Sequence, residues 1–191
     1  MCTLTNNHKK NSEVYLTMAG GFKHFGPTYV TTDYVRLGYE GDINGLHEIS
    51  AALVAAAPNA NGEVNIELAG KFAAMTVDGV TTAGAKGAGA VGLFREDLHD
   101  MANASLKASF YFRGGEYYVA EARLGAAVDT FTVGDAITSD ANGKIIKADV
   151  AAGDRVLGTV TFKGEFRNGN MYQWAGATAN GGLFLGFILH M

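Results

Sequence analysis

The stretch that decides the fold runs from Asp129 to Phe162 and begins DTFTVGDAITSDANGKIIKAD (residues 129–149). It closes with GDRVLGTVTF (residues 153–162). Short runs of β-branched and aromatic residues alternate with Gly, Asn and Asp, a pattern typical of short β-strands joined by tight turns. No nucleophile, paired base or ligand cluster lies within it, so the stretch specifies shape rather than chemistry.

Turn signals divide this stretch. Asn142-Gly143 predicts a hairpin between residues 136–138 and 145–146, because Asn-Gly suits turn positions that need a positive φ. Gly134-Asp135 and Gly153-Asp154 predict two further turns, each followed by a β-rich run. The last run alternates, which predicts a strand with Val156, Gly158, Val160 and Phe162 on one face and Thr159 and Thr161 on the other.

The opening TFTVGDAIT, the Asn-Gly-Lys hairpin and the closing GDRVLGTV resemble the small β-domains of tailed-bacteriophage capsid decoration (cement) proteins. The resemblance covers residues 129–162, a minority of the 191-residue chain. It implies a virion protein on the outside of an icosahedral shell, where it binds the phage major capsid protein, often as a homotrimer at a local threefold axis.

Composition limits the classes of partner. Hydrophobic residues make up 48% of the chain, enough for a sizeable core, and 26 Gly against 2 Pro indicate many turns. The formal net charge of −4 disfavours non-specific binding of nucleic acid. No apolar run approaches the ~18 residues of a membrane helix, and residues 1–10 lack the apolar core of a signal peptide. We therefore expect no nucleic-acid or membrane partner, and synthesis in the host cytoplasm before incorporation into the virion.

Cys2 is the single cysteine, so it cannot form an internal disulfide. Two interpretations remain open. It is either an unreactive thiol on a mobile tail or the site of an intermolecular disulfide between subunits in an oxidising medium.

Three segments are predicted: an extended N-terminal arm and aromatic segment (1–41), an α+β domain (42–128) and a C-terminal β-module (129–191). The first segment is rich in Tyr and Phe, and we expect Phe22, Phe25 and Tyr29 to contact the capsid or a neighbouring subunit. The alternative is that these aromatic side chains join the core of their own domain.

Periodicity predicts the remaining elements. Helices are expected at 46–57 and 93–101, and residues 81–92 are expected to form a loop. Strands are expected at 28–32, 34–37, 63–68, 71–80 with a turn at Asp78-Gly79, 171–175 and 183–189, together with a hairpin over 106–124 that turns at 113–116. The predicted fold is mainly β, an antiparallel β-barrel or tulip-like module with one or two short helices, with α+β as the alternative.

Two motifs invite a chemical interpretation. Gly87-Ala-Gly-Ala-Val-Gly92 matches the dinucleotide-binding pattern GxGxxG, which needs a strand before it and a long helix after it. We expect neither, and predict a flexible or tightly packed loop. Glu96 and His99 have the i, i+3 spacing of carboxylate metal helices, but no second matching motif exists, so a solvated surface is the simpler interpretation.

Other chemistry has weaker support. No serine lies in a Gly-x-Ser-x-Gly elbow, so no catalytic residue and no cofactor is predicted, and we expect the chain not to be an enzyme. Trp174, beside Tyr172, is a candidate for a capsid or subunit contact. The same two rings could stack on a sugar, so a carbohydrate-binding β-domain is one alternative, and a phage tail or fibre protein is another.

Overall fold

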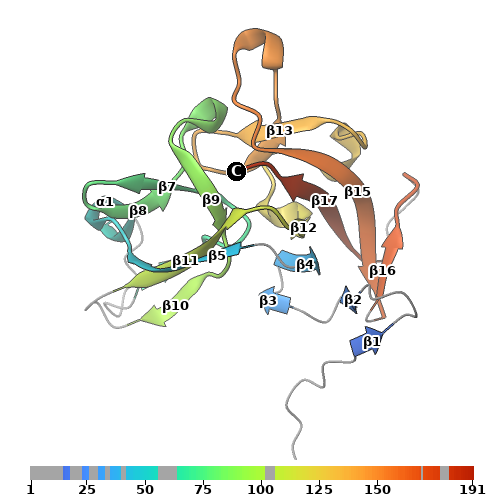
Figure 1. The fold of residues 1–191 in the computed structure, drawn as a ribbon, viewed down its shortest axis with the longest axis horizontal. Coiled ribbons are helices and arrows are strands. Elements are labelled where there is room, and N and C mark those ends of the chain that lie inside the picture. The colour runs from blue at the N-terminus through green and yellow to red at the C-terminus, as the bar shows by residue number, and fades with distance from the viewer. Residues whose placement is uncertain are drawn as a thin grey trace, which may run out of the picture.

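The computed structural model describes residues 15–17, 23–25, 30–32, 35–39, 42–55, 64–101, 106–168, 170–176 and 181–191. These residues form a mainly antiparallel β structure (Figure 1), which confirms the predicted fold class. Two larger sheets dominate, and every strand pair within them is antiparallel.

The larger sheet has eight strands and is built around β15, the longest strand described. Its order is β14 (Ile145–Lys147), β13 (Ala136–Ser139), β15 (Gly158–Arg167), β17 (Gly182–Leu189), β12 (Glu116–Ala120), β4 (Val35–Tyr39) and β3 (Val30–Thr32), with β16 (Asn170–Gln173) paired to β15.

The smaller sheet has five strands. Its order is β5 (Asp42–Glu48), β11 (Lys107–Arg113), β9 (Ala90–Phe94), β7 (Phe72–Thr76) and β8 (Gly79–Thr82). Two-stranded sheets pair β1 (Tyr15–Thr17) with β2 (Lys23–Phe25) and β6 (Val64–Ile66) with β10 (Leu98–Met101). The helical elements are α1 (Ala51–Ala55) and the 3-10 turns η1 (Ala85–Gly87), η2 (Glu121–Arg123), η3 (Val128–Thr130) and η4 (Val150–Ala152).

The five-stranded sheet is the middle layer, because both of its faces are buried. Phe72, Leu93 and Tyr111 belong to a first core that also contains side chains of the eight-stranded sheet, whereas their chain neighbours Phe94 and Phe110 belong to a second core. The second core is covered by β6 and β10 through Ile66 and Leu98, and by Leu53 and Val54 of α1. Consecutive apolar residues in these strands therefore serve opposite faces.

Two strands form within 106–124, but the second ends at Ala120 instead of Leu124, and the predicted hairpin between them is wrong. β11 pairs with β5 and β9, whereas β12 pairs with β17 and β4. Gly114 and Gly115, with φ of 59° and 85°, carry the chain from one sheet to the other. The rings of Tyr111 and Tyr117, both fully buried, lie 4.7 Å apart at this crossing. Burial of these two rings between the sheets favours the crossing over a hairpin.

Both predicted helices need correction. Within 46–57, residues 46–48 complete β5 and only Ala51–Ala55 are helical, while residues 56–57 lie outside the described range. Within 93–101 no helix forms, because Leu93 and Phe94 end β9 with side chains in different cores and Leu98 pairs with Ile66 in β10. The predicted loop at 81–92 contains the end of β8, η1 and the start of β9.

The face predicted for Phe162 is wrong, because a β-bulge precedes this residue. The register with β17 shifts between Val160, opposite Phe187, and Phe162, opposite Gly186. Val160 and Phe187 are buried in the first core, but Phe162 lies beyond the bulge and packs edge-on against Tyr118, with ring centroids 5.8 Å apart. The extra residue, Thr161, reverses the alternation that the sequence predicts.

Neither sheet closes into the predicted barrel among the described residues. The edge strands of the five-stranded sheet meet only at one parallel bridge, Ile49 with Val80, supported by a 2.8 Å hydrogen bond from Ser50 N to the Val80 carbonyl. The predicted segment boundaries at 41/42 and 128/129 are not boundaries between sheets, since the eight-stranded sheet takes strands from all three segments.

Candidate functional site

The glycine-rich motif at 87–92 is a packed joint between the two sheets. Strand β9 begins within the motif, at Ala90, where dinucleotide binding needs a helix, and it pairs antiparallel with β7. Gly87 has a φ of +74° and lies against Arg155 and Thr138. A Cβ at Gly92 would overlap the Phe110 ring on the neighbouring strand. Close packing explains these two glycines without a nucleotide.

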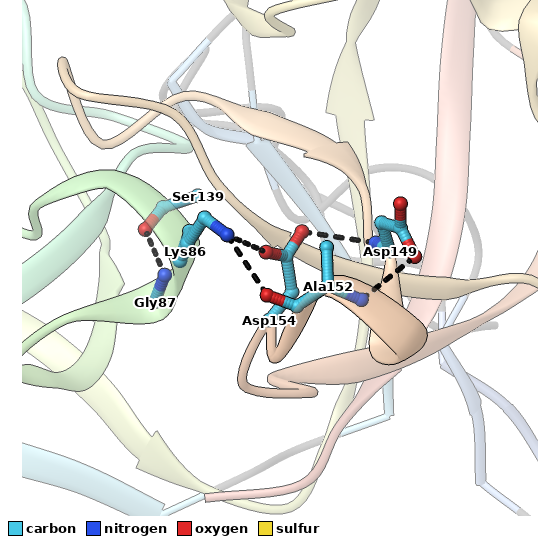
Figure 2. Close-up of polar contacts among 6 residues, drawn as sticks. All are labelled: Lys86, Gly87, Ser139, Asp149, Ala152 and Asp154. Carbon is cyan, nitrogen blue, oxygen red and sulfur yellow. Dashed lines mark hydrogen bonds and ion pairs between the residues drawn. The ribbon is translucent and has the colours of Figure 1, made fainter.

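Hydrogen bonds fasten this joint to the eight-stranded sheet (Figure 2). The Gly87 amide donates to Ser139 Oγ at 3.2 Å, and the Ser139 hydroxyl in turn donates to the Gly84 carbonyl. Arg155 donates two hydrogen bonds to the loop, from its amide to the Lys86 carbonyl at 3.0 Å and from Nη1 to the Ala90 carbonyl at 2.8 Å. The loop is therefore held in one conformation.

Lys86 extends the joint towards the η4 turn. Its Nζ donates to the Ala152 carbonyl at 2.9 Å and lies 3.5 Å from Asp154 Oδ1. Asp149 accepts from the Ala152 amide at 3.1 Å, and its own amide donates to Asp154 Oδ2 at 2.9 Å. The lysine side chain is 59% exposed, so this ion pair contributes little to stability by itself.

Asp97 and Arg123 form a buried ion pair, which we call the clasp. Asp97 Oδ1 accepts from the amides of Leu68 and Ala69 at 2.7 and 2.8 Å, and Asp97 Oδ2 pairs with Arg123 Nη2 at 2.7 Å. Arg123 also pairs with Glu67 at 2.8 Å. The Arg123 and Asp97 side chains are 5% and 3% exposed. The clasp ties the link between β6 and β7 to η2, and sequence analysis missed it because its partners are far apart in the chain.

The metal-helix interpretation of Glu96 and His99 fails, because residues 98–101 form a strand. Glu96 accepts from Ser109 Oγ at 3.2 Å, and the His99 side chain lies outside the described part. Among the side chains that the structure describes, no group of three or more His, Cys, Asp or Glu could hold a metal ion. No helix within the same residues is long and apolar enough to cross a membrane.

The predicted hairpin at Asn142-Gly143 is confirmed, with a different turn. Gly143 has a φ of +75°, but Asn142 does not have a positive φ. Asp140 Oδ1 instead accepts from the amides of Asn142 and Lys144 at 2.8 and 2.9 Å, and the Asp140 amide donates to the Lys144 carbonyl. A three-residue loop with a left-handed glycine thus joins β13 to β14.

The two aromatic candidates for sugar binding are engaged with cations. Trp174 is partly buried against the first core, and Lys163 Nζ lies 5.5 Å from its ring centroid. Tyr172 is 41% exposed, and the Arg167 guanidinium carbon lies 4.6 Å from its ring centroid. One face of each ring is therefore occupied by a cation, which leaves less ring surface for a sugar.

Most of the residues predicted to make N-terminal contacts lie outside the part of the chain that the structure describes. Cys2, Phe22 and Tyr29 lie outside the described residues, and Phe25 ends β2, with no side chain described. Their contacts with a capsid or a neighbouring subunit therefore stay predictions.

Burial perturbs one tyrosine on the eight-stranded sheet. Burial, the nearby Glu116 carboxylate and a hydrogen bond to that carboxylate together raise the pKa of Tyr118 to about 12. Glu116 Oε1 also accepts from Thr161 Oγ1 at 2.9 Å, beside the bulge. The Tyr118 phenol therefore stays neutral and donating at physiological pH.

Large apolar side chains are exposed at several turns, a feature that sequence analysis missed. Val77 is 100% exposed between β7 and β8, Val133 is 58% exposed before β13, and Val150 is 60% exposed in η4. Apolar residues at predicted turns could have indicated exposed apolar side chains, but the alternation used to predict strands says nothing about residues in turns. Single exposed valines are ordinary, so only a group of them indicates a contact surface.

Comparisons with known proteins add no assignment. No protein-family model matches the chain, and no curated protein matches it.

Proposed function

We propose that the chain is a structural virion protein that binds the outer surface of a tailed-phage capsid and stabilises the shell. The observation that carries the proposal is the resemblance of residues 129–162 to capsid decoration proteins. It is supported by the folding of that stretch into antiparallel strands, with hairpin β13–β14 and strand β15 in one sheet. The loop joint at 84–90 fastens this sheet to the middle layer, which suits a rigid building block.

The mechanism is stabilisation by mass action. A subunit that binds the assembled shell better than the free capsid protein shifts the equilibrium towards the shell. Many symmetric copies, as homotrimers on the major capsid protein, multiply a modest affinity per site. The proposed contacts with the capsid or a neighbouring subunit are made by the N-terminal segment, through Phe22, Phe25 and Tyr29. Trp174 is a further proposed contact.

Immunoelectron microscopy tests the location. An antibody raised against the purified chain is applied to tailed-phage particles from the source of the sequence. Many labels per head are expected; labels confined to tails would favour the tail or fibre alternative, and unlabelled particles would refute the proposal.

Add-back of purified chain tests the activity. Shells stripped of the chain are mixed with it, and their thermal disruption is followed by light scattering. Added chain is expected to raise the disruption temperature. A variant that lacks residues 1–29, a deletion that stops just before β3, is expected to bind the shells poorly. Normal binding of this variant to the shells would refute the role of the N-terminal segment. Selective binding on a glycan array, with no binding to shells, would favour the carbohydrate alternative.

A further inference from the structure

The loop that joins β13 to β14 is docked on the five-stranded sheet. Gly143 is buried, and its carbonyl accepts from the Phe72 amide at 2.7 Å, at the start of β7. A Cβ at Gly143 would lie 2.9 Å from the Phe72 carbonyl oxygen and 3.0 Å from Thr82 Cβ. Because Gly143 also has a φ of +75°, this contact between the sheets requires a glycine.

The residue before this glycine is an asparagine, and the two together can react without an enzyme. Glycine has no side chain to shield its backbone nitrogen, so in an Asn-Gly pair that nitrogen can attack the Cγ atom of the asparagine. A bond forms between the nitrogen and Cγ, the bond from Cγ to the side-chain nitrogen breaks, and ammonia leaves with the proton of the glycine amide. Water then opens the succinimide ring at one of its two carbonyl groups, which gives aspartate or isoaspartate. The Asn142 side chain is exposed, so water reaches it.

Hydrogen bonds oppose this reaction in the folded loop. The Gly143 amide must lose its proton to attack, yet it donates that proton to the Asp140 carbonyl at 3.2 Å. The Asn142 amide donates to Asp140 Oδ1 at 2.8 Å, and the Gly143 carbonyl is held by the Phe72 amide. Because both residues are held, the peptide unit between Asn142 and Gly143 cannot rotate to bring its nitrogen against Cγ. The loop has to leave β7 before the ring can close.

We infer that Asn142 is a site of spontaneous deamidation that reacts when the β13–β14 loop leaves the five-stranded sheet, and that the isoaspartyl product keeps the loop from docking again. Isoaspartate adds a methylene group to the main chain just before Gly143. Gly143 then cannot keep its bonds to Asp140 and Phe72 together, because the close packing leaves no room for a longer loop. Aspartate keeps the normal main chain and adds only a carboxylate at an exposed position. This chemistry is independent of capsid binding.

Peptide mapping of the full chain measures the reaction. The wild-type chain is kept at mildly alkaline pH, either folded in buffer or unfolded in guanidinium chloride, and is then digested with trypsin. Asn142 is the single asparagine of the tryptic peptide 124–144, so the mass gain that accompanies loss of the side-chain amide identifies the site. Asn142 should react at least about tenfold more slowly in the folded chain, because only the undocked fraction reacts. Equal rates would overturn the inference.

Two matched variants separate the loop from general stability. Asp140→Ala removes the acceptor of the Asn142 and Lys144 amides, so the folded variant should react at least about fivefold faster than the wild type. Asp149→Ala removes a carboxylate that accepts from the Ala152 amide in η4, and its rate should stay at the wild-type value. Circular dichroism checks that both variants are folded before incubation. No acceleration in Asp140→Ala, or the same acceleration in Asp149→Ala, would contradict the role of the loop.

Hydrogen exchange tests the effect of the product. A partly reacted sample is refolded, and deuterium uptake is compared between the separated forms of the peptide that contains residue 142. The isoaspartyl form should exchange faster than the asparagine form, because the amides of the undocked loop lose their protection. Asn142→Asp carries the added charge on a normal main chain and should keep wild-type protection. Equal uptake by the isoaspartyl and asparagine forms, or an Asn142→Asp variant that exchanges as fast as the isoaspartyl form, would refute the block on docking.

Discussion

Replacement of Arg123 by methionine should destabilise the protein strongly, because it leaves the Asp97 carboxylate buried without this cation. Both side chains are almost fully buried, and the 2.7 Å ion pair is the contact between η2 and the link that leads into β10. Methionine keeps most of the apolar volume of the side chain, so the change removes charge more than packing.

The expected loss is about 3 kcal/mol in the free energy of unfolding. Removing one partner of a buried ion pair costs about 3–5 kcal/mol, and the two backbone amides that donate to Asp97 Oδ1 place the loss at the lower end. Glu67→Gln, by contrast, should cost less than about 1 kcal/mol, because the Glu67 side chain is 69% exposed.

Urea unfolding at neutral pH, followed by tryptophan fluorescence and circular dichroism, measures these losses. The double variant Arg123→Met with Asp97→Asn should be more stable than Arg123→Met alone, because it removes the uncompensated charge while the amide oxygen of the new asparagine can still accept from Leu68 and Ala69. If the two changes simply add, or if Arg123→Met costs no more than Glu67→Gln, the clasp is not an ion pair that matters for stability.

Three further predictions concern single sites. Gly92→Ala should cost about 1–3 kcal/mol in thermal unfolding, because the new Cβ overlaps a buried ring. The loss should exceed that of Gly182→Ala, a strand position where the new Cβ would meet only Phe184 at 3.5 Å; equal losses would contradict the close packing. Glu116→Gln should lower the pKa of Tyr118 from about 12 towards 10, as measured by NMR titration. Because the raised pKa makes the free energy of unfolding of the wild type fall between about pH 10 and pH 12, the variant should lose less stability over that range. An unchanged pKa of Tyr118 would exclude Glu116 as a cause. Asp140→Ala should cost about 1–2 kcal/mol through the two amides it leaves unpaired, with wild-type stability as the contrary result.

Local chemistry made the hairpin β13–β14 predictable. The Asn-Gly pair and its flanking β-branched residues give the turn and both strands, and Gly143 has the expected positive φ. The loop type could not be deduced, because it depends on Asp140 accepting two amides. Capping by a neighbouring Asp competes with the two-residue turn that Asn-Gly favours.

Pairing between distant strands was not predictable from local patterns. Gly114-Gly115 is compatible with a hairpin, and the strands on each side have the alternation of one. The chain crosses between the sheets instead of forming a hairpin because Tyr111 and Tyr117 are buried there, and this burial depends on strands far along the chain. Likewise the spacing of Phe94, Leu98 and Met101 suits a helix, but Leu93 and Phe94 lie in the separate cores on the two sides of β9, which makes that part a strand.

The position of the five-stranded sheet limits where this molecule can meet others. Because both faces of that sheet are buried, its strands offer a partner their ends, their turns and the two edges at β5 and β8. On the eight-stranded sheet, the bulge at Thr161 moves Phe162 out of the first core onto the face that carries Tyr118. Gly186 lies beneath both rings, where a Cβ would come within 2.8 Å of Phe162 and 2.7 Å of Tyr118. The surface chemistry of the fold is thus decided by a bulge and by turn tips, features that a strict two-residue alternation does not predict.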